Sequence, residues 1–62
     1  MKVQVDGKSI EVEEGIRISG LLTQLGIQSE TVFSIRDGKV LTSDEVISAG
    51  DEIQFKKVIA GG

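Results

Sequence analysis

Residues 2–12 read Lys2-Val3-Gln4-Val5-Asp6-Gly7-Lys8-Ser9-Ile10-Glu11-Val12, two alternating runs on either side of an Asp-Gly pair. Asp-Gly between such runs is a strong hairpin signal, because a type I′ turn needs positive φ at both central positions. A two-residue loop places Val5 opposite Lys8 and Val3 opposite Ile10. This register gathers the apolar side chains on one face and the polar ones on the other, so the segment predicts a β-hairpin with one buried face.

An amphipathic helix is predicted after the hairpin. Its apolar residues recur with the spacing i, i+3, i+4, i+7, namely Ile18, Leu21, Leu22 and Leu25. Its end is well marked, because Gly26 can adopt the left-handed conformation and Ile27 can pack back on the last turn. Its beginning is poor, since Arg17 is not a good capping residue and Gly20 costs about 1 kcal/mol relative to Ala inside a helix. We therefore expect packing on a sheet, rather than propensity, to stabilise this helix.

Residues 31–41 contain a second Asp-Gly between two strand-like runs. The same two-residue pairing sets Ile35 opposite Val40. Apolar Phe33 and Ile35 alternate with polar neighbours, which predicts a strand that is buried on the face carrying these two side chains.

The next segment, Thr42-Ser43-Asp44-Glu45, has the spacing of a capping box, which predicts a short helical turn that includes Val46 and Ile47. A last strand is expected over residues 52–58, and its inner face carries Ile53 and Phe55. Segregated strands with one main helix indicate an α+β domain, with the helix on one face of a sheet. At 62 residues the chain is expected to be a single domain, residues 1–62.

Composition limits the chemistry. A domain of this size buries only roughly 60% of the surface of its unfolded chain, which leaves no room for a deep active-site cleft. The chain has no His, Cys or Tyr, so the usual general acids, bases and nucleophiles reduce to carboxylates, lysines and hydroxyls. Without an apolar signal region or a stretch of ~18 apolar residues, we expect a cytoplasmic protein with no membrane partner.

The net charge is −3, from ten acidic and seven basic residues, which disfavours binding to nucleic acid. It suits solubility, and it also favours a basic docking site on a partner. The acidic residues have no metal-loop spacing, so we expect no metal site and interpret them as solvated surface; they are Glu11, Glu13, Glu14, Asp44, Glu45, Asp51 and Glu52.

The most informative feature is the sequence Val58-Ile59-Ala60-Gly61-Gly62 after the last strand. Two glycines there bury nothing and cap nothing. They would let an extended backbone without side chains pass through a narrow channel and present the carboxylate of Gly62 sterically bare. A frayed terminus that happens to end in glycine is the alternative. Val58 and Ile59 either form an exposed apolar patch for a partner or, in the case of Val58, finish the sheet and pack locally. The outer sheet face, with Gln4, Gln54 and Lys56, is another possible docking face.

Over its whole length the chain resembles the ThiS/MoaD family of ubiquitin-like sulfur carriers. The most specific segments are Arg36-Asp37-Gly38-Lys39-Val40, Gly50-Asp51-Glu52-Ile53 and Val58-Ile59-Ala60-Gly61-Gly62, and the helix stretch Leu21-Leu22-Thr23-Gln24-Leu25-Gly26-Ile27 also fits. The resemblance implies the β-grasp fold, a mixed sheet of about five strands packed on one main helix, with residues 59–62 as a flexible, protruding tail. It implies a monomeric carrier that is not itself an enzyme.

The resemblance also implies a reaction. A separate activating enzyme uses ATP and Mg²⁺ to adenylate Gly62, with Gly61 as its partner residue, and no cofactor is bound by the carrier. Besides Gly61, we expect Ala60, Ile59 and Val58 to be recognised as parts of the tail. The acyl-adenylate becomes a thiocarboxylate, with sulfur taken from a donor and passed to a synthase for thiamin, molybdopterin or thiolated RNA.

Three other functions remain open. A small archaeal-type modifier would join the activated Gly62 to target lysines. A purely non-covalent β-grasp interaction domain would not need its tail, and an autonomous enzyme fits the composition least. The chain's own lysines could accept another copy of the carrier; they are Lys2, Lys8, Lys39, Lys56 and Lys57.

Overall fold

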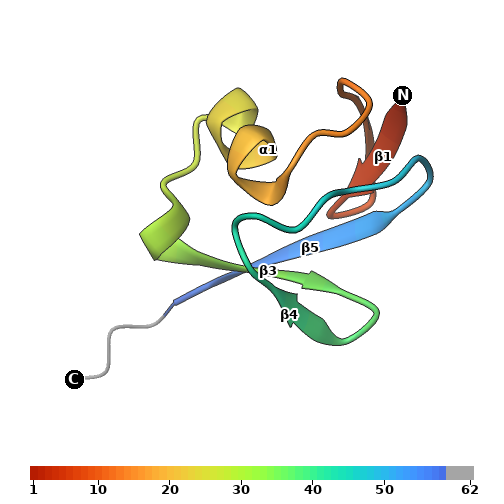
Figure 1. The fold of residues 1–62 in the computed structure, drawn as a ribbon. Coiled ribbons are helices and arrows are strands. Elements are labelled where there is room, and N and C mark those ends of the chain that lie inside the picture. Colours follow the sequence, from red (N-terminus) through yellow and green to blue (C-terminus); the bar gives the residue numbers. More distant parts are fainter. Residues whose placement is uncertain (59–62) are drawn as a thin grey trace.

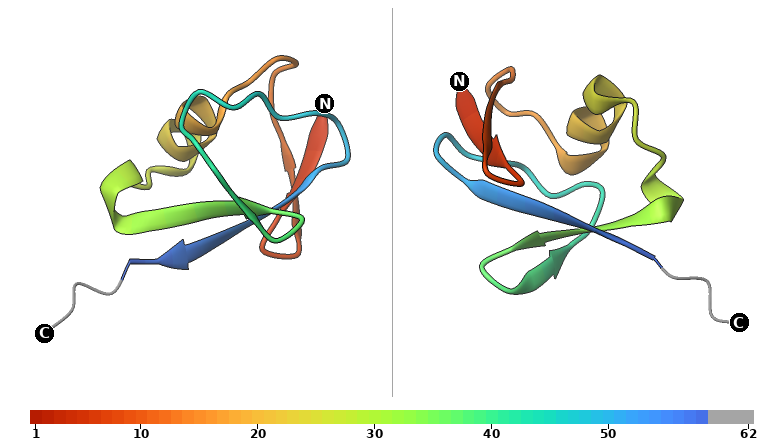
Figure 2. Two further views of the ribbon diagram at one scale, coloured as in Figure 1. Left: turned by 60° about the horizontal axis from the view of Figure 1, so that its bottom comes forward. Right: turned by 180° about the vertical axis from the view of Figure 1, so that it is seen from behind.

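The computed structural model describes residues 1–58, which form a five-stranded mixed sheet with one α-helix on one face (Figure 1). In chain order the elements are β1 (Lys2–Val5), β2 (Lys8–Glu11), α1 (Ile18–Leu25), the 3₁₀ turn η1 (Ser29–Thr31), β3 (Val32–Arg36), β4 (Lys39–Leu41) and β5 (Glu52–Lys57). The strand order is β2-β1-β5-β3-β4. Strands β1 and β5 are parallel and the other neighbours are antiparallel. This is the predicted β-grasp arrangement, and Figure 2 shows from two further sides that α1 stays on one face of the sheet.

Both Asp-Gly turns have the predicted geometry. The φ angles are positive at all four central residues: Asp6 50°, Gly7 83°, Asp37 53° and Gly38 76°. The registers are also confirmed, since Val3 pairs with Ile10 across the first turn and Ile35 pairs with Val40 across the second. Glycine at the second central position lets each turn adopt φ angles that would strain a residue with a Cβ.

The prediction that Phe33 and Ile35 face the core is wrong. The side chain of Phe33 is 48% exposed, whereas Ser34 between them is buried. The cause is the pairing of β3 with β5, in which Ser34 lies opposite Phe55. Ile53 is fully buried, and side chains alternate along a strand, so Phe55 lies on the same inner face as Ile53. Because paired residues share a face, Ser34 lies on the inner face as well.

One hydrophobic cluster joins the helix to the sheet. Its buried members are Val3, Val5, Val12, Ile18, Leu21, Leu22, Ile47 and Ile53. The stripe predicted for α1 supplies three of them, and Leu25 packs against the cluster while partly exposed. The predicted helix end is confirmed, because the N–H of Gly26 bonds to the carbonyl of Thr23 and the N–H of Ile27 to that of Leu22. These two bonds form a Schellman motif.

The start of α1 is stabilised by the loop that connects β4 to β5. Arg17 makes no side-chain capping bond. The N–H of Ile18 instead donates to the carbonyl of Glu45 (3.0 Å), and the N–H of Ser19 donates to that of Ser43 (2.9 Å). A distant segment thus satisfies donors that a local capping residue would normally satisfy.

The capping box predicted at residues 42–45 is wrong. The Thr42 hydroxyl donates to the carboxylate of Asp44 (2.6 Å), and Val46 forms an isolated β-bridge with Arg17. The same hydroxyl lowers the pKa of the Asp44 carboxyl. The segment is therefore a single turn, closed by a bond from the N–H of Glu45 to the carbonyl of Thr42 (3.1 Å), followed by a bridge. The carbonyls of Ser43 and Glu45 accept bonds from the start of α1, so the segment does not continue as a helix.

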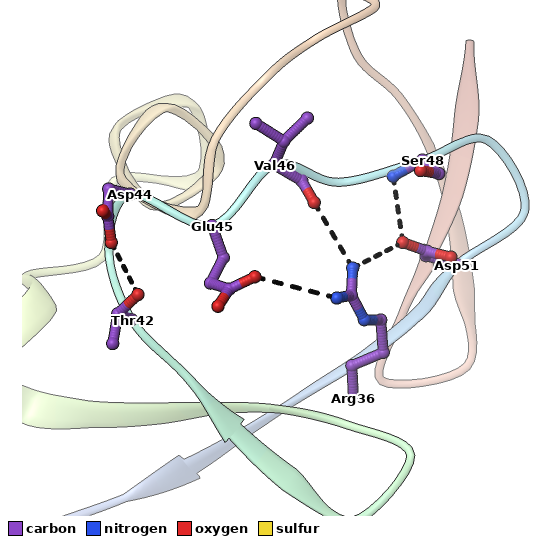
Figure 3. Close-up of polar contacts among 7 residues, drawn as sticks. All are labelled: Arg36, Thr42, Asp44, Glu45, Val46, Ser48 and Asp51. Atoms are coloured by element: carbon purple, nitrogen blue, oxygen red, sulfur yellow. Dashed lines mark hydrogen bonds and ion pairs between the residues drawn. The ribbon is translucent and has the colours of Figure 1, made fainter.

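A cluster of polar contacts around Arg36 holds this loop against β3 (Figure 3). The guanidinium donates to the carboxylate of Asp51 (2.9 Å) and to the carbonyl of Val46 (3.3 Å), and lies 3.9 Å from the carboxylate of Glu45. The N–H of Ser48 also donates to Asp51 (2.9 Å). Asp51, interpreted from the sequence as solvated surface, is instead a partly buried ion-pair partner.

We expect Arg36→Ala to lower the free energy of unfolding by about 1–2 kcal/mol. The substitution removes bonds to a charged partner and to a carbonyl in a partly exposed setting, where such bonds contribute moderately. Thermal unfolding followed by circular dichroism measures the loss. Lys39→Ala, which removes an exposed cation from the neighbouring strand, is the matched control and should change stability little. Equal effects of the two substitutions would contradict the role assigned to Arg36.

Candidate functional site

Four of the five predicted tail residues, Ile59, Ala60, Gly61 and Gly62, lie outside the described residues. Val58, the fifth, is described and follows β5 directly. Its N–H donates to the carbonyl of Thr31 (2.9 Å), and its side chain is 41% exposed. Both interpretations of Val58 therefore hold in part, because its backbone extends the pairing of β5 while its side chain contributes exposed apolar surface.

A cleft of about 520 Å³ lies beside the point where the chain leaves the sheet. It is lined by Asp6, Ile27, Thr31, Val32, Phe55, Lys57 and Val58. We call it the tail-base cleft. Its walls come from the β1–β2 turn, the connection between α1 and β3, and the second half of β5. Sequence reasoning missed it, because no local pattern shows where these three segments meet.

The tail-base cleft exists because β5 is longer than its parallel neighbour. Strand β1 pairs with β5 at Gln4–Glu52 and Val5–Ile53, and β5 continues to Lys57. Beyond β1, the carboxylate of Asp6 accepts a hydrogen bond from the N–H of Phe55 (3.3 Å). A side chain thus takes the place of a strand at this position, and the inner face of β5 remains open next to it.

The tail-base cleft combines an apolar interior with charge at its rim. Ile27, Val32 and Phe55 pack against the core and turn part of their surface toward the cleft. Asp6 and Lys57 place one carboxylate and one ammonium group at the edge. Within residues 1–58, no three acidic side chains are grouped so that they could hold a metal ion, and no helix is long and apolar enough to cross a membrane. The cleft therefore offers apolar contact and a few polar groups that could orient a partner.

A second apolar surface lies on the outer face of the sheet. The sequence analysis described this face only by its polar residues. Phe33 is 48% exposed and Val40 is 63% exposed. Phe33 pairs with Lys56 and Ile35 with Gln54, so apolar and polar side chains alternate across this face. Sequence analysis assigned Phe33 and Ile35 to the core and so missed the apolar part.

The mixed sheet wrapped on one helix, with β5 at its centre, defines a ubiquitin-like β-grasp domain. The chain belongs to the ThiS family, whose model matches residues 2–62. Proteins of this family are small carriers rather than catalysts.

Individual relatives agree with this assignment. An uncharacterized protein of Archaeoglobus fulgidus is 41% identical over 61 residues, which cover 97% of this chain and 90% of the relative. The crystal structure of the thiamine biosynthesis protein ThiS from Geobacter metallireducens superposes with a TM-score of 0.82 at 29% identity, with all of both chains covered. The crystal structure of SAMP1 from Haloferax volcanii gives a TM-score of 0.68 at 15% identity, over 98% of this chain and 97% of that one, and shows a shared fold.

Proposed function

We propose that this protein is a sulfur carrier that a separate enzyme adenylates at the carboxylate of Gly62. The observation that carries the proposal is the family match, which extends through residue 62 and so includes both final glycines. The likeness to a ThiS protein over the full length of both chains supports it.

The proposed reaction has two steps. In the first, an oxygen of the Gly62 carboxylate attacks the α-phosphorus of ATP, pyrophosphate leaves, and a mixed anhydride with AMP forms. In the second, a hydrosulfide equivalent from a sulfur donor attacks the acyl carbon and AMP leaves, which gives the thiocarboxylate. A free carboxylate is a poor electrophile, so the first step supplies the leaving group that the second step needs.

The carrier and the enzyme divide the work. ATP and Mg²⁺ belong to the activating enzyme, where the metal ion and basic side chains stabilise the charge that develops on phosphate. This chain supplies an unhindered carboxylate after two residues without side chains, together with a folded body for recognition. Because it contains no His and no Cys, we assign it no imidazole and no thiol in either step.

The acceptor of the sulfur belongs to one of three classes: a synthase for thiamin thiazole, one for molybdopterin, or an enzyme that thiolates transfer RNA. Since the reaction consumes ATP and produces a thiocarboxylate, whose sulfide-level sulfur is sensitive to oxidation, we place it in the reducing cytoplasm. In the alternative function, a modifier, lysine amines attack the same activated Gly62 and form isopeptide bonds.

Intact-mass analysis tests the proposal. With ATP, Mg²⁺ and an adenylating enzyme from the same host, the protein should gain the mass of one adenylyl group, which is AMP less one water. After addition of a sulfur donor, its mass should instead exceed the starting mass by the difference between sulfur and oxygen. Absence of any adenylate would refute the proposal, whereas adenylation followed only by lysine-linked conjugates in the host would replace the sulfur carrier by the modifier.

A further inference from the structure

We propose that the tail-base cleft is a docking pocket for one aromatic side chain of the adenylating enzyme, placed beside the entrance of the channel that receives the tail. This inference rests on the proposed function, since it assumes that Gly62 reacts in a site on another protein. Under this inference the enzyme recognises two elements of the carrier: the tail, and a pocket on the folded body.

The reach of the chain brings the enzyme close to this position. Four residues separate Val58 from the reacting residue Gly62, and a fully extended chain advances at most ~3.6 Å per residue. Gly62 can therefore lie no farther than roughly 14 Å from Val58 when it reacts. An enzyme that surrounds Gly62 must come within that distance of Val58, so the surface around Val58, including the tail-base cleft, is close enough to the enzyme to be contacted.

The lining favours an aromatic occupant over a charged or small polar one. The interior is formed by Ile27, Val32 and Phe55, and burying an unpaired charge against such surfaces is costly. Aromatic rings contribute large apolar area and pack well against another ring such as that of Phe55. They are also enriched among the residues that dominate binding energy when they fill pockets at interfaces.

The rim fits the polar end of an aromatic side chain. The carboxylate of Asp6 already accepts one bond from the N–H of Phe55, and a carboxylate has capacity for more. It can accept a further bond from the O–H of a tyrosine or the N–H of a tryptophan. Lys57 also lines the cleft, and its ammonium group can lie over the ring face, where the ring electrons attract it.

Two substitutions test the docking pocket, each with a matched control. Thr31→Glu places a carboxylate at the cleft. Its control, Thr23→Glu, places a carboxylate on the exposed side of α1, away from the cleft. Both threonines are exposed and donate their hydroxyl to a backbone carbonyl, Thr31 to Gln28 (2.6 Å) and Thr23 to Ser19 (2.9 Å), so each change removes one such bond and adds one charge.

The second pair is Val58→Asp and Val46→Asp. The two valines have similar exposure, 41% and 49%, but only Val58 lines the cleft. Val58 adjoins the tail in the sequence, so Val58→Asp could weaken binding through either the cleft or the tail. Thr31 lines the cleft but is far from the tail in the sequence, so Thr31→Glu tests the cleft alone. Thermal unfolding verifies that each variant is folded, and Val58→Asp keeps the test valid if Thr31→Glu fails to fold.

The measurement is the affinity of each full-length variant for the adenylating enzyme without ATP, together with the kinetics of ATP–pyrophosphate exchange. Thr31→Glu and Val58→Asp should weaken binding about tenfold or more and raise KM accordingly, with kcat at saturation nearly unchanged. Thr23→Glu and Val46→Asp should bind like the parent.

Three results would overturn the inference while leaving the proposed function intact. The first is parent-like affinity of both cleft variants when the parent itself supports exchange. The second is a loss of affinity confined to a fifth variant, Val40→Asp, which carries its charge on the exposed outer face of the sheet; that loss would place the enzyme on the outer face. The third is a change in the amide resonances of Ile59 and Ala60 in free Thr31→Glu, which would identify the chain's own tail as the occupant. No exchange with the parent would instead refute the proposed function.

Discussion

Leu21→Ala should lower the free energy of unfolding by about 3–5 kcal/mol, the range for a leucine removed from a tightly packed core. The side chain of Leu21 is fully buried, at 0% exposure, in the cluster between α1 and the sheet. A domain of this length is expected to have a total stability of roughly 3–9 kcal/mol. The variant should therefore be partly unfolded at 25 °C, which urea titration followed by circular dichroism would detect.

Leu25→Ala is the matched control on the same helix. Leu25 belongs to the same apolar stripe but is only partly buried, so its truncation leaves less unfilled volume and should cost clearly less. The sequence alone suggested Leu25 as a core position, and the structure shifts the centre of the core one helical turn toward the start of α1. A larger loss for Leu25→Ala than for Leu21→Ala would mean that α1 is rotated from the orientation described.

The two hairpins were predictable because their signals are local. Asp6-Gly7 and Asp37-Gly38 each specify a two-residue turn, and the turn then determines which residues face one another. The end of α1 was predictable for the same reason, since Gly26 adopts the left-handed conformation with φ at 71°. In all three places, conformation depends on residues that are neighbours in sequence.

The errors occurred where distant segments decide the conformation. Alternation alone could not show that Ser34 would be buried and Phe33 exposed, because the pairing of β3 with β5 determines that choice. Gly20 looked like a weakness of the helix. In the structure, a Cβ there would lie 3.0 Å from the Cγ1 of Ile16, so glycine allows the chain before the helix to pack closely against it.

The candidate site also has one part that could be predicted from local sequence and one part that depends on distant segments. Composition and the order of elements were sufficient to single out residues 58–62, since small residues after a last strand stand out in the sequence. The tail-base cleft needed the structure, because it arises from the different lengths of β1 and β5 and from the position of the turn at Asp6. A candidate docking surface on the folded body is thus harder to predict from the sequence than a candidate reacting group in residues 58–62.

Adding one alanine after Gly62 should reduce adenylation at least about 100-fold, because small misplacements of reacting atoms have effects of that size. One more residue moves the carboxylate by up to ~3.6 Å. The rate of ATP–pyrophosphate exchange measures the effect, and mass analysis must show that the added residue is not trimmed. The thermal unfolding of the extended protein should match that of the parent, since the proposal gives residue 62 no part in the core.

Gly61→Val is the companion substitution, and it keeps the carboxylate at its original distance from the body. A β-branched residue restricts the backbone and adds bulk inside a channel that is proposed to accept only glycine, so exchange should slow while affinity for the folded body persists. If binding without ATP is retained in both variants and exchange is lost, the body docks and the tail reacts as two separable elements. Exchange at the parental rate in the extended, untrimmed protein would show that Gly62 is not the reacting residue.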